Sequence, residues 1–361
     1  MNKILIISTH PPYDYRIYRH IKMLTKHYYD ITYINIVNPN NKFSKESPVC
    51  GIKYVQIQFA KKFSVKNMIS LSKLFSHLNF TRWDVIFIQD PKLIFFPFLF
   101  MKKNLYLDIH ENQDLRDKLD GKALTFYLRK RKSVIFSPYK CVLDEFHNCV
   151  SFHIDNRPLK EDFSVAEYSR NLIPTVIYVG MITNQFRQMN KLFDVFEILL
   201  QRQINVVLIG KVSNMNIDKN LMEKINYLST YNNFEYLGFQ NRVEVIKQLY
   251  KSHFSISLMD LKENVSISPN KLYESLATGN IIITDHLNID SLSLMDFDII
   301  SLNKTDTPQI VAESILQNIN NELVHRCEQQ TQNFDSKQLY WENYDPIYEN
   351  FLNLNNTKKL K

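Results

Sequence analysis

The stretch Pro269-Asn270-Lys271-Leu272-Tyr273-Glu274-Ser275-Leu276-Ala277-Thr278-Gly279 is followed by the apolar run Ile281-Ile282-Ile283 and by Asp285. Proline suits the first turn of a helix, where a missing backbone N–H costs nothing, and glycine suits the left-handed cap that ends one. The stretch therefore predicts a helix that feeds a short buried strand. An ordinary amphipathic helix with a proline start is the alternative interpretation.

The start of this helix is suited to an anionic ligand. Its first turn presents free N–H groups and a partial positive charge, which favour a phosphate. Lys271 adds a full charge in that turn, and Glu274, one turn on, is placed to accept hydrogen bonds from vicinal hydroxyls such as those of a ribose. One segment thus offers groups for both ends of a nucleoside diphosphate.

The spacing Pro269-x-Lys271-x-x-Glu274-x-x-Ala277-x-Gly279 resembles an element of the retaining glycosyltransferases of family 4, which have the GT-B fold. The resemblance implies a hexosyltransferase-type enzyme that takes a sugar from a nucleotide-diphosphate donor, most often a UDP-sugar, with retention at the anomeric carbon. No metal or other cofactor is required if the helix start and its basic side chains stabilise the departing diphosphate. The donor contacts that it implies in this segment come from Pro269, Asn270, Lys271, Leu272 and Glu274.

The rest of the chain is organised as alternating strands and helices. At 361 residues it suits two domains, and the alternation predicts α/β architecture with doubly wound parallel sheets. Two such series in tandem predict two Rossmann-like domains facing across a cleft that holds the ligands. We place the acceptor-binding domain at 1–165 and the donor-binding domain at 166–335; segment 336–361 is expected to form a helix returning to the first domain, plus a tail. Strands are expected at 4–8, 31–37, 55–59, 85–89, 105–110, 134–136, 150–153, 176–179, 206–209, 234–237, 254–258, 281–284 and 299–302; helices at 15–27, 65–78, 92–101, 139–147, 190–201, 218–230, 242–251, 270–278 and 339–352.

Charge is distributed unevenly along the chain. Residues 1–170 hold 27 Lys and Arg against 16 Asp and Glu, whereas residues 171–361 hold 17 against 21. A basic first half indicates an anionic partner, such as a membrane surface or an anionic glycan. The densest run is Tyr127–Lys132, for which a solvated helix face is the alternative interpretation. Aromatic and basic residues are not interleaved and nucleic-acid motifs do not occur, so we expect no nucleic-acid partner.

Cysteine spacing and hydropathy bear on the compartment. None of the four cysteines forms a C-x-x-C pair or a metal-binding spacing. The first residues are too short for a signal peptide and read as a buried strand. The apolar run Leu93–Met101 is about nine residues long, against the ~20 that cross a bilayer, so a buried helix is expected there. We therefore expect a cytoplasmic protein, peripheral to the inner face of the membrane.

Two segments of the first half extend the resemblance. The loop Thr9–Ile17 is similar to the family's loop after the first strand and implies acceptor-side roles for His10, Asp14 and Arg16. It lacks the glycines that many relatives carry there. Asp108-Ile109-His110-Glu111 resembles the family's D-x-H-E, which implies that His110 faces the donor sugar as a catalytic group and that Glu111 lies on the acceptor side. A structural Asp–Arg pair and a structural histidine are the alternatives.

The second half carries further donor positions and two departures. Gly180 and Met181 end an expected strand, and Arg187 follows in a loop where the family places basic residues that neutralise the diphosphate; the resemblance implies catalytic roles for Arg187, Lys271 and Glu274. Gly210 and Gly238 are expected to serve backbone geometry. Met181 stands where many relatives carry Arg, and Ser266 where many carry a first Glu. In that loop the resemblance implies donor contacts from Glu263, Asn264 and Ser268.

These departures leave alternatives open. We interpret the chain as a glycosyltransferase acting on a glycan or a lipid-linked acceptor in bacterial capsule or lipopolysaccharide synthesis. A GT-B nucleotide-sugar epimerase would share the fold and donor but would need catalytic acids in the cleft. A catalytically silent subunit that binds a glycan or a partner enzyme is the third hypothesis, motivated by Met181 and Ser266.

Overall fold

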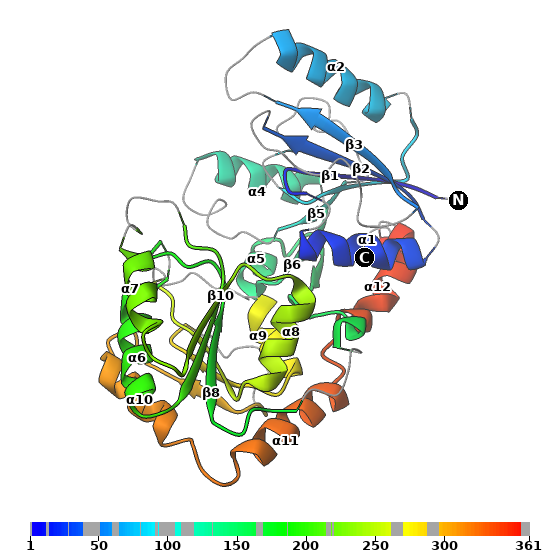
Figure 1. Cartoon of the computed structure of the whole chain (residues 1–361). Coiled ribbons are helices and arrows are strands. Elements are labelled where there is room, and N and C mark those ends of the chain that lie inside the picture. Colours follow the sequence, from blue (N-terminus) through cyan, green and yellow to red (C-terminus); the bar gives the residue numbers. More distant parts are fainter. Residues whose placement is uncertain are drawn as a thin grey trace. The chain divides into compact units, whose positions relative to one another are not determined.

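The computed structural model places most of the chain in two compact units (Figure 1). One unit comprises residues 1–156 and 341–361, and the other comprises residues 157–340. The residues that the structure describes are 2–11, 14–27, 29–38, 51–59, 65–79, 81–90, 93, 105–109, 119–131, 133–163, 169–185, 187–213, 218, 220–260, 270–286 and 296–354.

The first unit is built on a seven-stranded parallel sheet of order β3-β2-β1-β4-β5-β6-β7. Strands β4, β5 and β6 are buried along their whole length, as expected for strands covered on both faces. Helices α2, α4 and α5 pack on one face of this sheet through a shared apolar cluster that includes Leu74, Leu128 and Val142. The strands are β1 (Lys3–Ser8), β2 (Asp30–Val37), β3 (Lys53–Gln58), β4 (Val85–Ile88), β5 (Leu105–Asp108), β6 (Val134–Ser137) and β7 (Val150–His153); the helices are α1 (Tyr15–Lys26), α2 (Val65–Asn79), α4 (Leu119–Arg131) and α5 (Lys140–Glu145).

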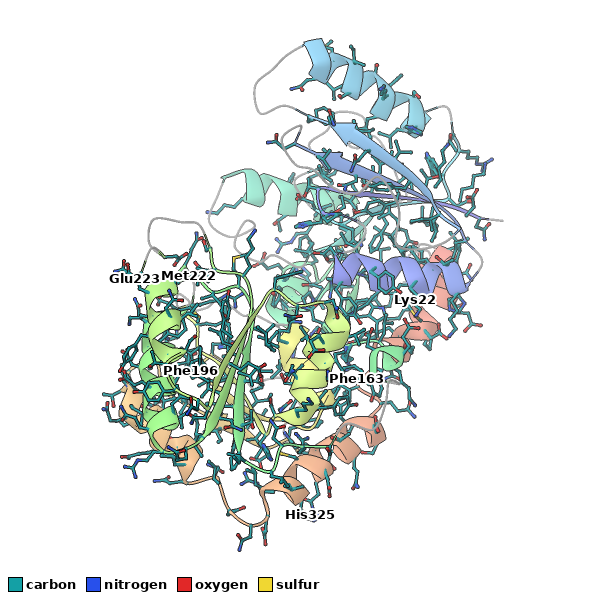
Figure 2. The ribbon with its side chains drawn as sticks, viewed as in Figure 1. Lys22, Phe163, Phe196, Met222, Glu223 and His325 are labelled. Atoms are coloured by element: carbon teal, nitrogen blue, oxygen red, sulfur yellow. The ribbon has the colours of Figure 1, made fainter. Side chains whose placement is uncertain are left out.

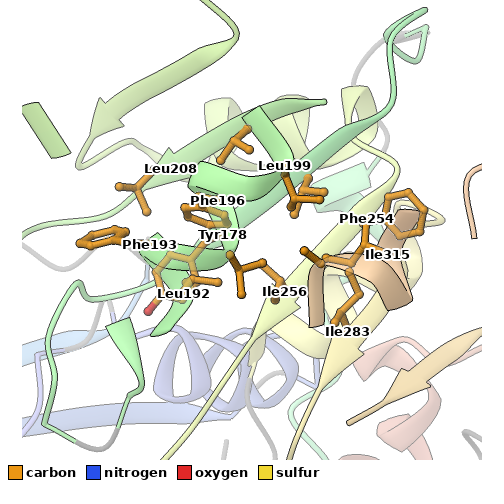
Figure 3. Packing of buried hydrophobic residues seen from close by; sticks show 14 of the residues in the cluster. Tyr178, Leu192, Phe193, Phe196, Leu199, Leu208, Phe254, Ile256, Ile283 and Ile315 are labelled. Carbon is orange, nitrogen blue, oxygen red and sulfur yellow. The ribbon is translucent and has the colours of Figure 1, made fainter. Parts of the chain in front are cut away.

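The second unit repeats this architecture with a six-stranded parallel sheet of order β10-β9-β8-β11-β12-β13. Phe193, Phe196 and Leu199 of α6 belong to an apolar cluster that also contains Leu208 of β9 and Ile315 of α10 (Figure 3). The strands are β8 (Thr175–Val179), β9 (Asn205–Ile209), β10 (Phe234–Gly238), β11 (Phe254–Ser257), β12 (Ile281–Thr284) and β13 (Ile299–Ser301). The helices are η2, a 3-10 turn (Lys160–Phe163), α6 (Met189–Gln201), α7 (Leu221–Leu228), α8 (Arg242–Lys251), α9 (Asn270–Ala277), α10 (Pro308–Leu316) and α11 (Leu323–Ser336).

Both sheets have the doubly wound order, in which the chain starts in the middle, moves to one edge and then returns to build the other. This confirms the predicted α/β class with two Rossmann-like sheets. Helices α4, α10 and α11 were not predicted. The helix expected at 92–101 lies outside the described residues except for Leu93, which is buried.

The last segment returns to the first unit, as predicted, but it is not one continuous helix. It consists of the 3-10 turn η5 (Trp341–Tyr344) and the short helix α12 (Asp345–Glu349). Pro346 explains the break, because its ring clashes with the carbonyl four residues earlier and it donates no hydrogen bond. Trp341 and Tyr348 are fully buried in the first unit, and the Tyr348 hydroxyl lies 2.8 Å from Nδ1 of His20.

No helix among the described residues is both long and apolar enough to cross a membrane.

Candidate functional site

The candidate site lies at the carboxyl ends of the strands of the second unit. In a doubly wound sheet, ligands bind where the strand order reverses, which here is between β8 and β11. Gly180 follows β8, Gly210 follows β9, and helix α9 follows the segment after β11. The N-terminal turn of α9 therefore lies at this same edge of the sheet.

Two of these glycines bring the loops after β8 and β9 into direct contact. A Cβ on Gly210 would lie 1.7 Å from the carbonyl oxygen of Gly180, a distance that no side chain can occupy. Gly210 also donates its N–H to the Gly238 carbonyl at 2.8 Å. The geometric role predicted for Gly210 is confirmed. At this point of the edge the two loops touch through the backbone of Gly180 and Gly210, with no side chain between them.

Arg187 lies next to Gly180. A Cβ on Gly180 would lie 3.3 Å from Nη1 of Arg187, and that nitrogen lies 3.5 Å from the Tyr178 hydroxyl. The same hydroxyl donates a 2.8 Å hydrogen bond to the Met181 carbonyl. The structure thus brings Gly180, Met181 and Arg187 together, with the Met181 side chain exposed to solvent.

Helix α9 has the ending that its sequence predicts. Gly279 adopts φ +77°, the left-handed conformation that favours glycine. Its N–H bonds the Leu276 carbonyl and the N–H of Asn280 bonds the Ser275 carbonyl, both at 2.9 Å, which is the Schellman pattern. Leu276 is fully buried. The cap and this buried residue hold the helix against the sheet, so its first turn is held in place.

Lys271 and Glu274 form an ion pair on that first turn. Nζ of Lys271 donates to Oε2 of Glu274 at 2.7 Å. The Glu274 side chain is 1% exposed, whereas that of Lys271 is 39% exposed. The carboxylate therefore lies beneath the helix start, and the ammonium group lies between it and solvent.

Arg242 completes this cluster and is not among the residues predicted from the sequence. It is the first residue of α8, and its Nη1 donates to Oε1 of Glu274 at 2.7 Å. Its Nη2 donates to Oδ2 of Asp162 at 3.0 Å. Asp162 belongs to η2. Phe163 of the same turn packs against the apolar cluster that contains Leu272 and Leu276 of α9 (Figure 2). The only sequence signal was an arginine at a helix start a few residues after a glycine, which is too common to identify a site.

The electrostatics of Glu274 follow from these contacts. Burial alone would raise its pKa, but Lys271 and Arg242 outweigh burial and lower it from an ordinary 4.5 to about 2. Glu274 is therefore ionised at neutral pH in an apolar setting, where it acts as an acceptor only. Burial raises the pKa of Asp162, and Arg242 offsets part of that rise.

A second carboxylate ties this edge of the sheet together. Asp285, directly after β12, accepts the backbone N–H of Met259 at 2.9 Å and the side-chain amide of Gln188 at 2.5 Å. Gln188 is the N-cap residue of α6. Asp285 thus joins the segments after β11 and β12 to the start of α6, a positioning role that its sequence context did not indicate.

The predicted residues of the first unit have different settings. Arg16 is 3% exposed and pairs through two nitrogens with Asp108, at 2.7 and 2.6 Å. A third nitrogen donates to Asn156 at 2.8 Å. Asp14 caps α1 and accepts the backbone N–H of Arg16, which is not an ion pair between their side chains. This burial favours a structural role for Arg16, while its acceptor-side role stays a prediction.

Other predicted residues are partly or wholly outside the described part of the chain. His10 is partly exposed and its carbonyl accepts the Tyr33 hydroxyl at 2.7 Å. Asn270 begins α9, and Leu272 is buried in the cluster beside it. The predicted residues that lie outside the described ranges are His110, Glu111, Glu263, Asn264, Ser266, Ser268 and Pro269.

Within the described ranges, the structure contains no group of three or more His, Cys, Asp or Glu side chains arranged to hold a metal ion.

Comparison with known proteins identifies the fold. No family model matches the sequence, and no curated protein matches it. A glycosyltransferase from Rickettsia africae ESF-5 is similar in structure with a TM-score of 0.71 at 12% identity, covering 98% of this chain and 99% of that one. Anabaena HepE, solved with UDP and glucose, has a TM-score of 0.65 at 12% identity, covering 98% and 100%. WaaG, a glycosyltransferase involved in lipopolysaccharide biosynthesis, has a TM-score of 0.67 at 9% identity, covering 96% and 99%. The chain has the GT-B fold, in agreement with the prediction.

Proposed function

We propose that the protein is a retaining glycosyltransferase whose second unit binds a nucleotide-diphosphate sugar, most simply a UDP-sugar. The observation that carries the proposal is the Lys271–Glu274–Arg242 cluster at the start of α9, at the ligand-binding edge of a doubly wound sheet. The GT-B fold and its neighbours, one of them solved with UDP and glucose, support it. We further propose that the first unit binds the acceptor, a glycan or lipid-linked glycan of a bacterial surface polysaccharide.

The diphosphate is held by positive charge. Lys271 stands on the first turn of α9, beside backbone N–H groups that have no partner within the helix. Arg187 lies beside Gly180, in the loop after β8, where its guanidinium supplies a second positive charge for a phosphate at this edge of the sheet. As the bond to the sugar breaks, negative charge builds on the diphosphate, and these fixed groups stabilise it.

Glu274 receives the ribose in this proposal. Each carboxylate oxygen can accept more than one hydrogen bond, so the bond from Arg242 does not exhaust Oε1. When a diphosphate is bound, the ammonium of Lys271 turns from Oε2 of Glu274 toward the phosphate. That exchange frees Oε2 for a ribose hydroxyl while Arg242 keeps the carboxylate ionised and in position.

Retention requires attack from the face that the diphosphate leaves. The acceptor hydroxyl attacks the anomeric carbon as the phosphate oxygen departs, and a leaving phosphate oxygen takes its proton. His110 and the loop residues Glu263, Asn264 and Ser268 contact the sugar in this proposal.

The test is a thermal-shift series with UDP, GDP, ADP and CMP. A ligand at one hundred times its Kd stabilises the folded state by about 2.7 kcal/mol, so the ranking of the four identifies the base. We expect UDP to give the largest shift and Lys271→Met to reduce it. Lys247→Met, at a partly exposed position of α8 where the lysine pairs with Glu244, is the matched control and should leave the shift unchanged. Equal, negligible shifts with all four nucleotides would contradict the proposal.

Activity separates the remaining hypotheses. NMR of the donor sugar with and without a lipid-extracted acceptor distinguishes transfer with retention from epimerisation of the donor alone. Binding of UDP without either product would favour the catalytically silent subunit, the hypothesis motivated by Met181 in place of Arg and Ser266 in place of Glu.

A further inference from the structure

The second unit contains a hollow of about 400 Å³ at the amino ends of its strands. Its lining comes from the starts of β9 and β10, the last turn of α8 and the loop before β8. The candidate site described above lies at the carboxyl ends of these parallel strands, so the hollow is at the opposite edge of the sheet. Its volume is within the range of about 300–1,000 Å³ that is typical of small-molecule sites.

Polar side chains of the lining lie on the face of the sheet that α8 covers. Val207 and Leu249 of α8 belong to one apolar cluster. Asn205 precedes Val207 by two residues, and Glu235 of β10 pairs in register with Val207. Side chains two residues apart on a strand, or paired across neighbouring strands, share a face of the sheet. Asn205 and Glu235 are therefore on the same side of the sheet as α8.

Two asparagines fix the walls of the hollow. The amide nitrogen of Asn233 donates to the carbonyls of Leu200 and Ile204, at 3.1 and 2.8 Å. Asn171 bonds the Lys251 carbonyl through its backbone N–H and the hydroxyl at the start of β8 through its amide nitrogen, both at 3.0 Å. The loop before β8, the end of α8 and the turn before β10 are therefore held in place, and the hollow is preformed.

Other polar groups of the lining are not used by the fold. Within the described ranges, the side chains of Asn205, Asn232, Glu235 and Lys251 have no hydrogen-bond or ion-pair partner in the protein. Gln248 donates its amide nitrogen to a glutamate of its own helix at 2.8 Å, which leaves its carbonyl oxygen as an acceptor. Asn205, Gln248 and Lys251 are only partly exposed, so these groups are presented inside a recess. Several unused polar groups that converge on a preformed recess indicate a polar ligand.

The carboxamides of the lining suit sugar hydroxyls. A hydroxyl group both donates and accepts hydrogen bonds, and a carboxamide presents a donor and an acceptor side by side. Asn205, Asn232 and Gln248 together can therefore satisfy neighbouring hydroxyls in either role. A polyhydroxylated ligand uses such a lining more fully than a ligand with few polar groups.

The charged and apolar residues of the lining disfavour other classes of ligand. Glu235 and Lys251 have opposite charges, so the hollow has no net charge that would attract a phosphate or a cation. Val206 and Val207 are buried, and Phe234 is the partly exposed apolar residue of the lining. One ring can contact the C–H face of a sugar, whereas a peptide would find no apolar pocket for its side chains.

We propose that this hollow is a carbohydrate site that binds one or two residues of a neutral glycan. It is separate from the donor site, which we place at the opposite edge of the sheet, and from the acceptor site, which we place in the first unit. A glycan held there would stay attached to the protein between encounters with the site of reaction. The proposal goes beyond the proposed function and concerns binding alone, so it holds or fails separately from transferase activity.

The experiment is saturation-transfer NMR of the full chain in excess UDP, with maltose, cellobiose, lactose and N,N′-diacetylchitobiose as probes. We expect saturable binding of at least one disaccharide, which neither UDP, inorganic phosphate nor a tetra-alanine peptide displaces. Binding of none of the four, or displacement by phosphate or by the peptide, would overturn the proposal. Displacement by UDP would overturn it too, because the sugar would then occupy the donor site.

Variants locate the sugar and separate hydrogen bonding from charge. Asn205→Ala with Glu235→Ala should weaken disaccharide binding about tenfold, because two hydrogen-bonding groups are removed. The matched control, Asn321→Ala with Glu322→Ala, removes the same two residue types at exposed positions before α11 and should change it less than about twofold.

Glu235→Gln with Lys251→Gln keeps hydrogen-bonding groups and removes both charges, so it should change disaccharide binding less than about threefold. Circular dichroism verifies that each variant is folded. Equal losses in the alanine pair and its control would place the sugar elsewhere, and a tenfold loss in the glutamine pair would show that charge, and not hydroxyl recognition, holds the ligand. Either result would refute the assignment.

Discussion

Replacing Arg242 by glutamine tests the electrostatic reasoning at the centre of the site. Arg242 holds Oε1 of Glu274 at 2.7 Å and Oδ2 of Asp162 at 3.0 Å, with its own side chain 25% exposed. Glutamine keeps the stem and one donor but removes the charge. Glu274, 1% exposed, would then have Lys271 as its one cationic partner among the contacts described above.

The magnitude follows from the pKa of Glu274. A folded-state value of about 2 against an ordinary 4.5 corresponds to about 3 kcal/mol, at roughly 1.4 kcal/mol for each pKa unit. Lys271 and Arg242 both contribute, so we assign about half of this to Arg242. The released Asp162 adds a smaller cost, since burial already raises its pKa. We expect Arg242→Gln to lower the free energy of unfolding by about 2 kcal/mol at pH 7.

The direction in which the free energy of unfolding changes with pH follows from the lowered pKa of Glu274. Because the folded-state pKa of Glu274 is lowered, its contribution is present above pH 4.5 and is lost as pH falls through the range from 4.5 to 2. In Arg242→Gln the folded-state pKa rises, so part of the contribution is already absent at neutral pH. The unfolded-state pKa is the same for wild type and variant, so their difference should shrink only as pH falls below the variant's folded-state pKa toward about 2.

The assay is urea unfolding followed by circular dichroism at pH 7, 5 and 2.5. Lys247→Gln, on the same helix and paired with Glu244 at 3.4 Å in a more exposed setting, is the matched control and should cost less than about 0.5 kcal/mol. The reasoning is refuted if Arg242→Gln and Lys247→Gln have equal effects, or if the effect of Arg242→Gln is the same at pH 7 and pH 2.5.

Other substitutions probe the backbone and the returning segment. Gly210→Ala should prevent stable folding of the second unit, because its Cβ would overlap the Gly180 carbonyl oxygen, whereas Gly238→Ala, with φ +65° and open space around it, should cost only about 1–2 kcal/mol in urea unfolding. Similar costs for the two would contradict the close approach of the loops. Tyr348→Phe should cost about 1 kcal/mol, measured by thermal unfolding, by leaving the buried Nδ1 of His20 without the hydroxyl. An unchanged midpoint would show that this contact contributes nothing.

Local signals in the sequence predicted the strands and much of the second unit. Strand 281–284 has the predicted bounds and β8 and β9 begin one residue earlier than predicted, because continuous apolar runs bounded by polar residues define buried parallel strands. Gly279 was recognisable as a cap, since little else tolerates φ +77°. These features depend on neighbours in the chain, so the sequence carries them directly.

Features that depend on distant residues were missed. Arg242 and Asp162 lie 32 and 112 positions from Glu274, and their pairing arises only when α8, η2 and α9 pack together. A structural pair of Arg16 with Asp14 was the alternative interpretation of this loop, but Arg16 pairs with Asp108, which folding brings from β5. The helix predicted at 339–352 is longer than α12, because the prediction followed the spacing of the aromatic residues and gave too little weight to Pro346.

The division of the first unit between the two ends of the chain has a consequence for biosynthesis. Its core is incomplete until Trp341, Tyr348 and Phe351 leave the ribosome, after the whole of residues 157–340. Until then, residues 1–156 lack the packing that Trp341 gives His20 and Phe351 gives Tyr106. The second unit already has all its residues and can fold first. A nascent chain stalled near position 340 would leave a protease-sensitive amino-terminal half attached to a resistant carboxyl-terminal one.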